Sequence, residues 1–371
     1  MSCPKRMLNG PCGGYNGVFC EDSSIECVWI KAFNNLKIYG REKDMFRLKL
    51  DSFFMIRDHR PSIRSLRDFL RSRGFKYFLI YEYVPRRDLS REKLREDLEK
   101  IYRVYEGVDF VDNPGGRPLQ SSIALASITK TLFPDKHVGF QITGRDHTRD
   151  MIATYIITAL SFGIDSIIAT TGDLKLGVQS KSVWDLDSPR IIYLAKLIND
   201  LGRDHMRRRV YTGTNKIFIG ASVNPYLNPL EPEIYKISVK RDAGADFFVT
   251  QPIYDVDILR VFLSGIRRLL LIDPREIDIV IGLGSISSKE IARFLFERSH
   301  VKIPQGIREA LENENKEALE EENIRFVRNL TRNIIREYPE NPPIFYISTF
   351  GEVDLGVKIG ELVRDEIRTI I

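Results

Sequence analysis

The placement of the cysteines is the first feature of the chain that could carry chemistry. Residues 1–27, MSCPKRMLNGPCGGYNGVFCEDSSIEC, contain all four cysteines of the 371 residues, Cys3, Cys12, Cys20 and Cys27. Chance would place four cysteines there about three times in a hundred thousand, so the cluster needs a cause. Thiolates can bind a metal or do redox chemistry, but gaps of eight, seven and six residues lack the close pair of common zinc and iron–sulfur sites. The spacing leaves metal binding and metal-free thiols both open.

A second group of reactive side chains lies where apolar runs of the sequence end. These positions hold acids, amides and hydroxyls, namely Glu82, Asp112, Asn113, Gln141, Thr143, Thr171, Asp173, Asn224 and Gln251. Carboxyl groups can store or donate a proton, and an amide can both donate and accept a hydrogen bond. Each also has a structural explanation, because Glu82 could pair with Arg86 or Arg87 and Asp173 could cap a turn. Convergence on one cavity would favour the functional interpretation for the set.

These side chains need a scaffold that brings the ends of separate runs together. From Lys76 onward, β-branched or aromatic runs alternate with helical stretches, and the predicted strands span 77–85, 108–114, 138–144, 166–173, 217–225, 246–253, 277–286 and 344–351. Eight such units predict an α/β fold, a (β/α)8 TIM barrel, with an open doubly wound sheet as the main alternative. The carboxyl ends of barrel strands meet at one face, where the polar residues would converge. The segment 305–340 is expected to add two helices before the last strand.

Composition and charge indicate the remaining organisation. We expect a Cys-rich metal-binding module at 1–40, a basic helical connector at 41–75 and the barrel at 76–371. Residues 41–103 hold 18 Lys and Arg against 11 Asp and Glu, but interleaved at helical spacing, which favours a solvated helix face over a nucleic-acid site. There is no apolar run of about 18 residues and no secretory leader, so we expect a cytoplasmic protein without a membrane span, in which disulfides are disfavoured.

Four segments of the barrel region have counterparts in a known family. They are YEYVP (81–85), SIIATTGD (166–173), KRDAGADFFVTQPIYD (240–255) and VKIPQGIREALE (301–312). They resemble segments of methylenetetrahydrofolate reductases. YEYVP resembles the glutamate motif of the first strand, and SIIATTGD resembles the fourth strand, which ends in Gly-Asp. KRDAGADFFVTQPIYD resembles the segment that runs from a lysine to Thr-Gln, and VKIPQGIREALE resembles the start of the helix after the seventh strand. The resemblance spans residues 76–371. It implies a flavin-dependent oxidoreductase of one-carbon metabolism that reduces methylenetetrahydrofolate, or a related pterin, to the methyl level.

The resemblance also implies roles for individual residues. Glu82 would be the general acid for the leaving nitrogen, Asp173 would stay ionised to stabilise positive charge, and Gln251 would bind the pterin or the nucleotide. Flavin contacts are implied for Gln141, Thr143, Thr171, Gly172, Asp173, Asn224 and Lys240. Gln141 and Thr171 stand where the family has His and Arg, and Asn224 and Asn228 where it has Tyr and His, which leaves FAD and FMN both open.

The cysteine segment has a separate resemblance. CPKRMLNGPCGG, followed by a cysteine and CVWIKA, is similar to a module that follows the barrel or forms its own subunit in anaerobic and archaeal reductases of this family. There the module is associated with an iron–sulfur cluster or zinc. The resemblance therefore implies a metal at Cys3, Cys12, Cys20 and Cys27, without deciding between iron–sulfur and zinc.

The electron donor and the functional class stay open at this point. NADH or NADPH could reduce a flavin directly, whereas a cluster would suit a ferredoxin-type donor docked on the basic stretch 41–103. The alternative to a reductase is a flavin- and metal-containing electron-transfer subunit, or a pterin-binding subunit, with no reductase activity of its own. The expected partners are a reduced folate or related pterin and an electron donor, in a homo-oligomer or a complex with a partner subunit.

Overall fold

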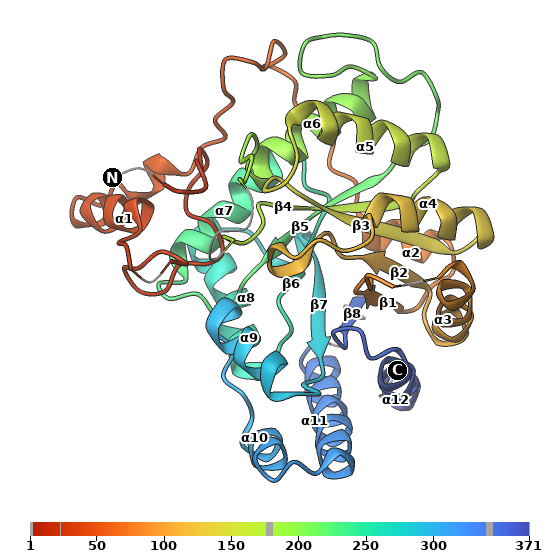
Figure 1. Cartoon of the computed structure of the whole chain (residues 1–371). Helices are drawn as coiled ribbons and strands as arrows, with labels where there is room; N and C mark the ends of the chain where they lie inside the picture. The colour runs from red at the N-terminus through yellow and green to blue at the C-terminus, as the bar shows by residue number, and fades with distance from the viewer. Residues whose placement is uncertain (1–2, 23, 89, 176–180, 339–343, 371) are drawn as a thin grey trace.

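The computed structural model describes residues 3–22, 24–88, 90–175, 181–338 and 344–370. At its centre is a closed barrel of parallel strands, in which each strand pairs with the next and β8 pairs with β1 (Figure 1). The strands are β1 (Phe78–Tyr83), β2 (Gly107–Phe110), β3 (His137–Thr143), β4 (Ser166–Thr170), β5 (Phe218–Val223), β6 (Phe247–Thr250), β7 (Asp278–Gly284) and β8 (Ile344–Ser348). The predicted barrel is confirmed. Each strand ends slightly before its predicted end, so several of the polar residues begin the following loops.

Helices on the outside of the barrel connect successive strands. They are α3 (Arg91–Val104), α4 (Ser122–Leu132), α5 (Arg149–Phe162), α6 (Ser188–Leu201), α7 (Glu231–Asp242), α8 (Val256–Leu270), α9 (Lys289–Ser299) and, after β8, α12 (Val353–Ile370). Ser90 and Thr148 precede α3 and α5, and each accepts a backbone hydrogen bond that would otherwise be unmade at the helix start. The two additional helices are confirmed as α10 (Gln305–Glu312) and α11 (Lys316–Glu337), while positions 339 and 340 of that prediction lie outside the described residues.

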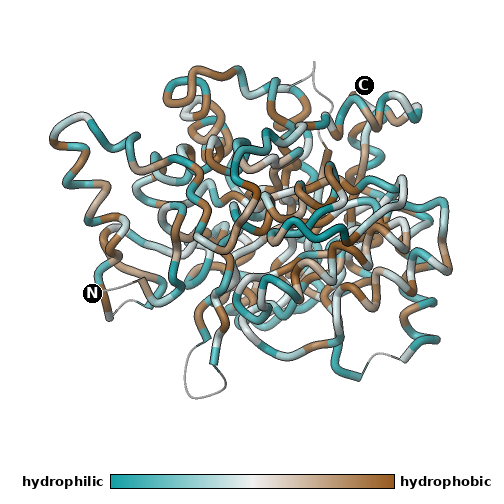
Figure 2. Tube along the Cα trace, turned by 90° about the horizontal axis from the view of Figure 1, so that it is seen from above, coloured by the Kyte–Doolittle hydropathy of each residue, from teal (hydrophilic) through white to brown (hydrophobic). Residues whose placement is uncertain are grey.

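Two apolar cores stabilise the barrel. The larger lies between strands and helices, and the smaller fills the barrel interior with side chains such as Phe218 and Phe247. Leu66 and Leu70 of α2 (Leu66–Ser72) pack into this inner core beside the first residues of the strands, so α2 closes the amino end. Figure 2 shows hydrophobic segments running through the middle of the molecule. The open end of the barrel is therefore the carboxyl end.

The N-terminal segment packs directly against the barrel. α1 (Val28–Ile38) and the 3-10 turn η1 (Glu42–Met45) share an apolar cluster with α7, in which Phe46 contacts Phe33 and Tyr235 with ring centroids 6.2 and 5.2 Å apart. The connector 41–75 contains η1 and α2 as its described helices. Within the described ranges, no helix is long and apolar enough to cross a membrane.

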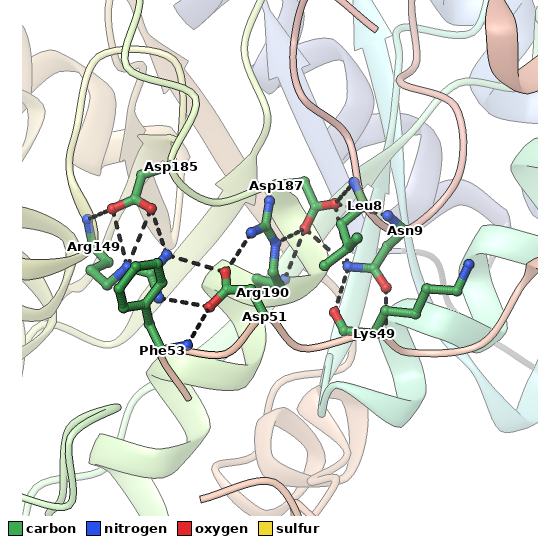
Figure 3. A network of polar contacts seen from close by, with 9 residues as sticks. All are labelled: Leu8, Asn9, Lys49, Asp51, Phe53, Arg149, Asp185, Asp187 and Arg190. Carbon is green, nitrogen blue, oxygen red and sulfur yellow. Dashed lines mark hydrogen bonds and ion pairs between the residues drawn. The ribbon is translucent and has the colours of Figure 1, made fainter. Parts of the chain in front are cut away.

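A network of charged side chains fastens this segment to the barrel (Figure 3). Asp187, buried just before α6, accepts hydrogen bonds from the backbone N–H groups at positions 8 and 9, at 2.9 and 3.0 Å. Asp187 also accepts from Arg190 Nε at 2.9 Å. Arg190 and Arg149 both donate to Asp51 of the connector, at 2.7 and 3.0 Å. The segment before α1 and the connector are therefore held by the same helices that surround the strands.

Candidate active site

A cavity of about 750 Å³ lies at the carboxyl ends of the strands. It is lined by every barrel residue for which the sequence predicted a catalytic or cofactor-binding role, namely Glu82, Gln141, Thr143, Thr171, Gly172, Asp173, Asn224, Lys240 and Gln251. Its volume lies within the usual range for sites that bind small molecules. Because the predicted residues converge there, this cavity is the candidate active site, and their individual roles remain predictions.

Glu82 on β1 forms part of the cavity wall. Its Oε1 accepts a hydrogen bond from Ser348 Oγ, and its Oε2 lies 3.5 Å from the Gln141 amide nitrogen. Burial raises the pKa of Glu82, and these hydrogen bonds offset only part of the effect. Arg86, considered above as a partner for Glu82, pairs with Asp88 instead. A carboxyl group in these surroundings keeps its proton at a higher pH than an exposed one.

Asp173 follows β4 on a turn that requires glycine. Gly172 has φ +89°, and a Cβ atom there would lie 2.1 Å from Thr143 Oγ1. Two neighbours hold the turn: Gly115 N donates to Asp173 Oδ2 at 3.3 Å, and Lys5 Nζ donates to the Gly172 carbonyl oxygen at 2.7 Å. The N-terminal segment therefore helps to position the candidate carboxylate.

Across the barrel from Glu82, amide side chains after β5 and β6 line the cavity. Gln251 Oε1 accepts a hydrogen bond from Ser299 Oγ at 3.0 Å, which fixes the orientation of the amide. Asn224 Nδ2 lies 3.5 Å from the carbonyl oxygen of Gly13 and 3.4 Å from that of Ser299. This wall thus has hydrogen-bonding groups in defined positions, and it too contacts the N-terminal segment.

Lys240 supplies a buried amine to the cavity. It lies on α7, is 3% exposed, and donates from Nζ to the Ser222 carbonyl oxygen at 2.6 Å. Burial lowers the pKa of Lys240 to about 8, although the charge of Glu233 opposes this. An anionic group on a ligand would stabilise the protonated amine. Together with the hydroxyl and amide groups around it, Lys240 fits an anionic, hydrogen-bonding cofactor such as a flavin.

The four cysteines lie in different surroundings. Cys12 lines the cavity, whereas Cys20 and Cys27 pack with Tyr15 in an apolar cluster. Burial raises the pKa of Cys3, Cys20 and Cys27, the last to about 11, and the charge of Cys12 adds to each of these shifts. Among the described residues, no three His, Cys, Asp or Glu side chains form a group that could hold a metal ion. As they lie, the four thiols do not fit a single-ion site.

Other residues of the cavity were missed by the sequence analysis. Tyr346 and Ser348 line it from β8, two positions apart on the inner face of the strand. Strand alternation is a signal that could have found them. Lys5 and Lys236 also line the cavity. No local pattern predicts their positions, since Lys5 reaches Gly172 across 167 residues of sequence.

Solved structures with similar barrels support the fold. The chain is similar to an uncharacterised protein from Clostridium thermocellum that binds two copies of 5-methyl-5,6,7,8-tetrahydrofolic acid, at 15% identity and a TM-score of 0.57, over 82% of this chain and 100% of that one. An F420-dependent secondary alcohol dehydrogenase in complex with an F420-acetone adduct is similar at 10% identity and a TM-score of 0.50, over 79% of this chain and 100% of that one. At these identities the likeness shows the fold alone.

Family comparisons go further than the structures. Residues 1–52 match a family described as methylene-tetrahydrofolate reductase C terminal, which here lies at the start of the chain. Residues 67–348 match the family described as methylenetetrahydrofolate reductase, and this match includes β1 to β8 and the cavity residues Glu82, Asp173 and Gln251. Since that match spans well over half of the sequence, the chain belongs to the methylenetetrahydrofolate reductase family.

Proposed function

We propose that this chain catalyses the flavin-dependent reduction of the methylene group of methylenetetrahydrofolate, or of a related pterin, to the methyl level. Membership of the family supports an oxidoreductase. The similar barrel from Clostridium thermocellum binds 5-methyltetrahydrofolic acid, which has the one-carbon unit at the product level of this reaction. The observation that carries the proposal is Glu82, a carboxyl group with a raised pKa in the wall of the cavity.

Glu82 would supply the proton that the reaction consumes. The methylene group bridges two nitrogens of the substrate, and one of them must be protonated to leave. A carboxyl group whose pKa is raised by burial still holds a proton at a pH where an exposed glutamate is ionised. The hydroxyl of Ser348 and the amide of Gln141 then stabilise the carboxylate that is left after transfer.

Asp173 and Gln251 would bind the substrate as it changes charge. Departure of the protonated nitrogen leaves positive charge on the one-carbon unit and the remaining nitrogen. The Asp173 carboxylate, held on its turn by Gly115 and by the Lys5 contact to Gly172, would stabilise that charge. Gln251, oriented by its hydrogen bond from Ser299, would recognise the pterin edge, which offers both donors and acceptors.

The flavin would be held by the polar residues at the ends of β3 to β5 and by α7. These are Gln141, Thr143, Thr171, Gly172, Asp173, Asn224 and Lys240, all of which line the cavity. Lys240 has the charge to pair with a phosphate or with the anionic part of the ring system. When bound, the flavin would supply the hydride, and the protein would position the substrate and move the proton.

The four cysteines carry no step of the proposed reaction. An iron–sulfur cluster or zinc centre there is supported only by the resemblance of the segment to a metal-binding module. NADH or NADPH would suffice as donor without a metal, whereas a ferredoxin-type donor would need an iron–sulfur cluster.

The absorption spectrum and metal content of the purified protein test the cofactor proposal. Flavin bands with no iron would support a nicotinamide donor, and flavin bands with a broad iron–sulfur shoulder and stoichiometric iron would support a ferredoxin-type donor. Absence of flavin, after incubation with FAD and with FMN, would contradict the proposed function.

Replacing Glu82 by Gln tests its role as the acid. We expect E82Q to lower methylene reduction by roughly 100-fold or more, while reduction of the bound flavin by its donor is unchanged. Glu366, a buried α12 carboxylate paired with Arg332 outside the cavity, provides the matched control E366Q. Full methylene reduction by E82Q would exclude Glu82 as the acid. Flavin turnover without methylene reduction in the unmodified protein would favour an electron-transfer subunit.

A further inference from the structure

A second buried carboxyl group lies beside Glu82. Asp109 on β2 is the register partner of Glu82 on β1, so the two side chains lie on the same face of neighbouring strands. Asp109 is 2% exposed and does not line the cavity, whereas Glu82 does. The reaction proposed above gives Asp109 no role, although it is the titratable group on the strand adjacent to the candidate acid.

Tyr346 connects the two carboxyl groups. Its hydroxyl donates to Asp109 Oδ2 at 2.7 Å and accepts from Gln141 Nε2 at 3.0 Å. Gln141 Nε2 also lies 3.5 Å from Glu82 Oε2, so Gln141 and Tyr346 join the two carboxyl groups in one hydrogen-bond network. Burial raises the pKa of Glu82, and the nearby Tyr346 hydroxyl lowers it in part.

No cation compensates the charge of Asp109 in the described part of the chain. The groups that affect its pKa are Tyr346, Glu82 and Gln141. Asp109 Oδ1 is buried without a hydrogen-bond partner, in a space that exists because residue 139 is glycine: a Cβ there would lie 2.7 Å from this oxygen.

His137 is a titratable group on the far side of that space. A Cβ at position 139 would also lie 2.5 Å from Ser166 Oγ, and that hydroxyl is 2.9 Å from His137 Nε2. Burial lowers the pKa of His137, so the ring is neutral near neutral pH. Asp109 therefore faces polar but uncharged groups on β3, β4 and β8, and a carboxyl group on β1.

Two adjacent, poorly solvated carboxyl groups do not both ionise readily. Burial raises the pKa of Asp109 to about 7, with the Tyr346 hydrogen bond lowering it and the charge of Glu82 raising it. Since the two groups repel each other when ionised, their protons are lost in steps that belong to the pair. Near neutral pH the pair therefore retains one proton.

We propose that Glu82 and Asp109 share this one proton, and that Asp109 is a positioning residue whose charge keeps Glu82 protonated for the reaction. The inference rests on the proposed function, in which Glu82 protonates the leaving nitrogen. As the Glu82 O–H bond breaks, its proton forms the new N–H bond of the leaving nitrogen, and Glu82 is left as a carboxylate. Asp109 stays a carboxylate that accepts from Tyr346 during this step, and water returns one proton to the pair when the cavity empties.

The variant D109N tests the charge of Asp109. Without that charge the repulsion on Glu82 disappears and its pKa falls, so the alkaline limb of methylene reduction should move to lower pH by about one unit. Above the limb the rate would fall roughly tenfold. KM for the folate should be unchanged, because Asp109 does not line the cavity. A pH profile identical to that of the unmodified protein would overturn the proposal.

The variant Y346F should act in the opposite direction. Removing a hydroxyl that donates to carboxylates raises the pKa of Glu82 and of Asp109, so the alkaline limb should move to higher pH while kcat falls. A merely structural disturbance would not give opposite shifts in the two variants. Asp97, a buried aspartate that accepts from Tyr83 at 3.0 Å outside the cavity, is the matched control, and D97N should leave the profile in place.

Infrared difference spectra separate this inference from the proposed function. They measure carboxyl protonation directly, and we would record them between about pH 5 and pH 9, on either side of the expected titration. The unmodified protein should show a protonated buried carboxyl band that titrates near neutral pH and is altered in both D109N and E82Q. If the protein shows this band but does not reduce the methylene group, the proposed function is contradicted while the shared proton stays supported. Methylene reduction without the band would overturn the shared proton.

Discussion

The strand ends and the N-terminal segment reach the same cavity by different means. On the strands, Glu82, Asp173 and Gln251 are far apart in sequence, yet all three line one space. In the N-terminal segment the cysteines are close in sequence, yet no described group of three could hold a metal ion. The segment instead contributes Lys5 and Cys12 to the lining.

The difference shows what fixes each set of side chains. Parallel strands in register place their carboxyl ends side by side whatever the length of the helices between them, so strand-end residues converge as a consequence of the fold. The N-terminal segment before α1 has no such repeat, and contacts to the barrel fix its path, such as those of Asp187 and Gly172. Three substitutions test whether the two regions are fixed in these different ways.

The largest effect is expected from D187A, which removes the attachment of the segment. Asp187 is 1% exposed, accepts from the backbone at positions 8 and 9, and pairs with Arg190. Removing one partner of a buried pair costs about 3–5 kcal/mol, so the free energy of unfolding should fall by that amount in urea titrations. Limited proteolysis should then cut near the N-terminus, before the barrel is attacked.

Asp185 in the same network gives the control for D187A. It pairs with Arg149, which also contacts Asp51, and it is less buried than Asp187 (Figure 3). D185A should cost less, about 1 kcal/mol, and should leave the N-terminus resistant to protease. Equal costs and equal protease sensitivity would contradict the view that Asp187 is the attachment point.

A smaller effect is expected from G172A, which disturbs the turn after β4 in the barrel. The alanine Cβ would meet Thr143 Oγ1 at 2.1 Å with φ at +89°, a combination that costs about 2–3 kcal/mol and displaces Asp173. Gly74 in the connector has φ +83° with open space around it, so G74A measures the strain without the clash, about 1 kcal/mol. Flavin and folate titrations should show weaker binding for G172A and unchanged binding for G74A.

The barrel and the residues at its strand ends could be predicted from the sequence. Apolar runs that alternate with helices predicted the barrel, and reading each run to its end found residues such as Glu82 and Gln251. The residues missed are those placed by tertiary contacts. Lys5 lies near the N-terminus and contacts Gly172. Asp109 on β2 accepts a hydrogen bond from Tyr346 on β8, and sequence patterns do not predict this contact between separate strands. Clustering of cysteines indicated a cause but could not show whether the thiols meet.

The smallest effect is expected from K5M, which tests whether the N-terminal segment contributes to the chemistry of the cavity. Lys5 is buried, pairs with Glu21 and donates to the Gly172 carbonyl oxygen. Methionine keeps the apolar stem of the side chain but not its charge. Glu21 retains its pair with Arg298 at 2.7 Å, so the cost in unfolding free energy should be limited to about 1–2 kcal/mol.

Methylene reduction should report on K5M more sensitively than stability does. Without the Lys5 hydrogen bond the turn of Gly172 is held less firmly, and the Asp173 carboxylate would be less well placed, which we expect to lower kcat about tenfold. Lys31 lies in the same segment but is exposed and pairs only at the surface with Glu26, at 3.3 Å, so K31M should change neither quantity. If K5M retained full activity despite its lower stability, the segment would brace the barrel without shaping the active site, and the two regions would be coupled through folding alone.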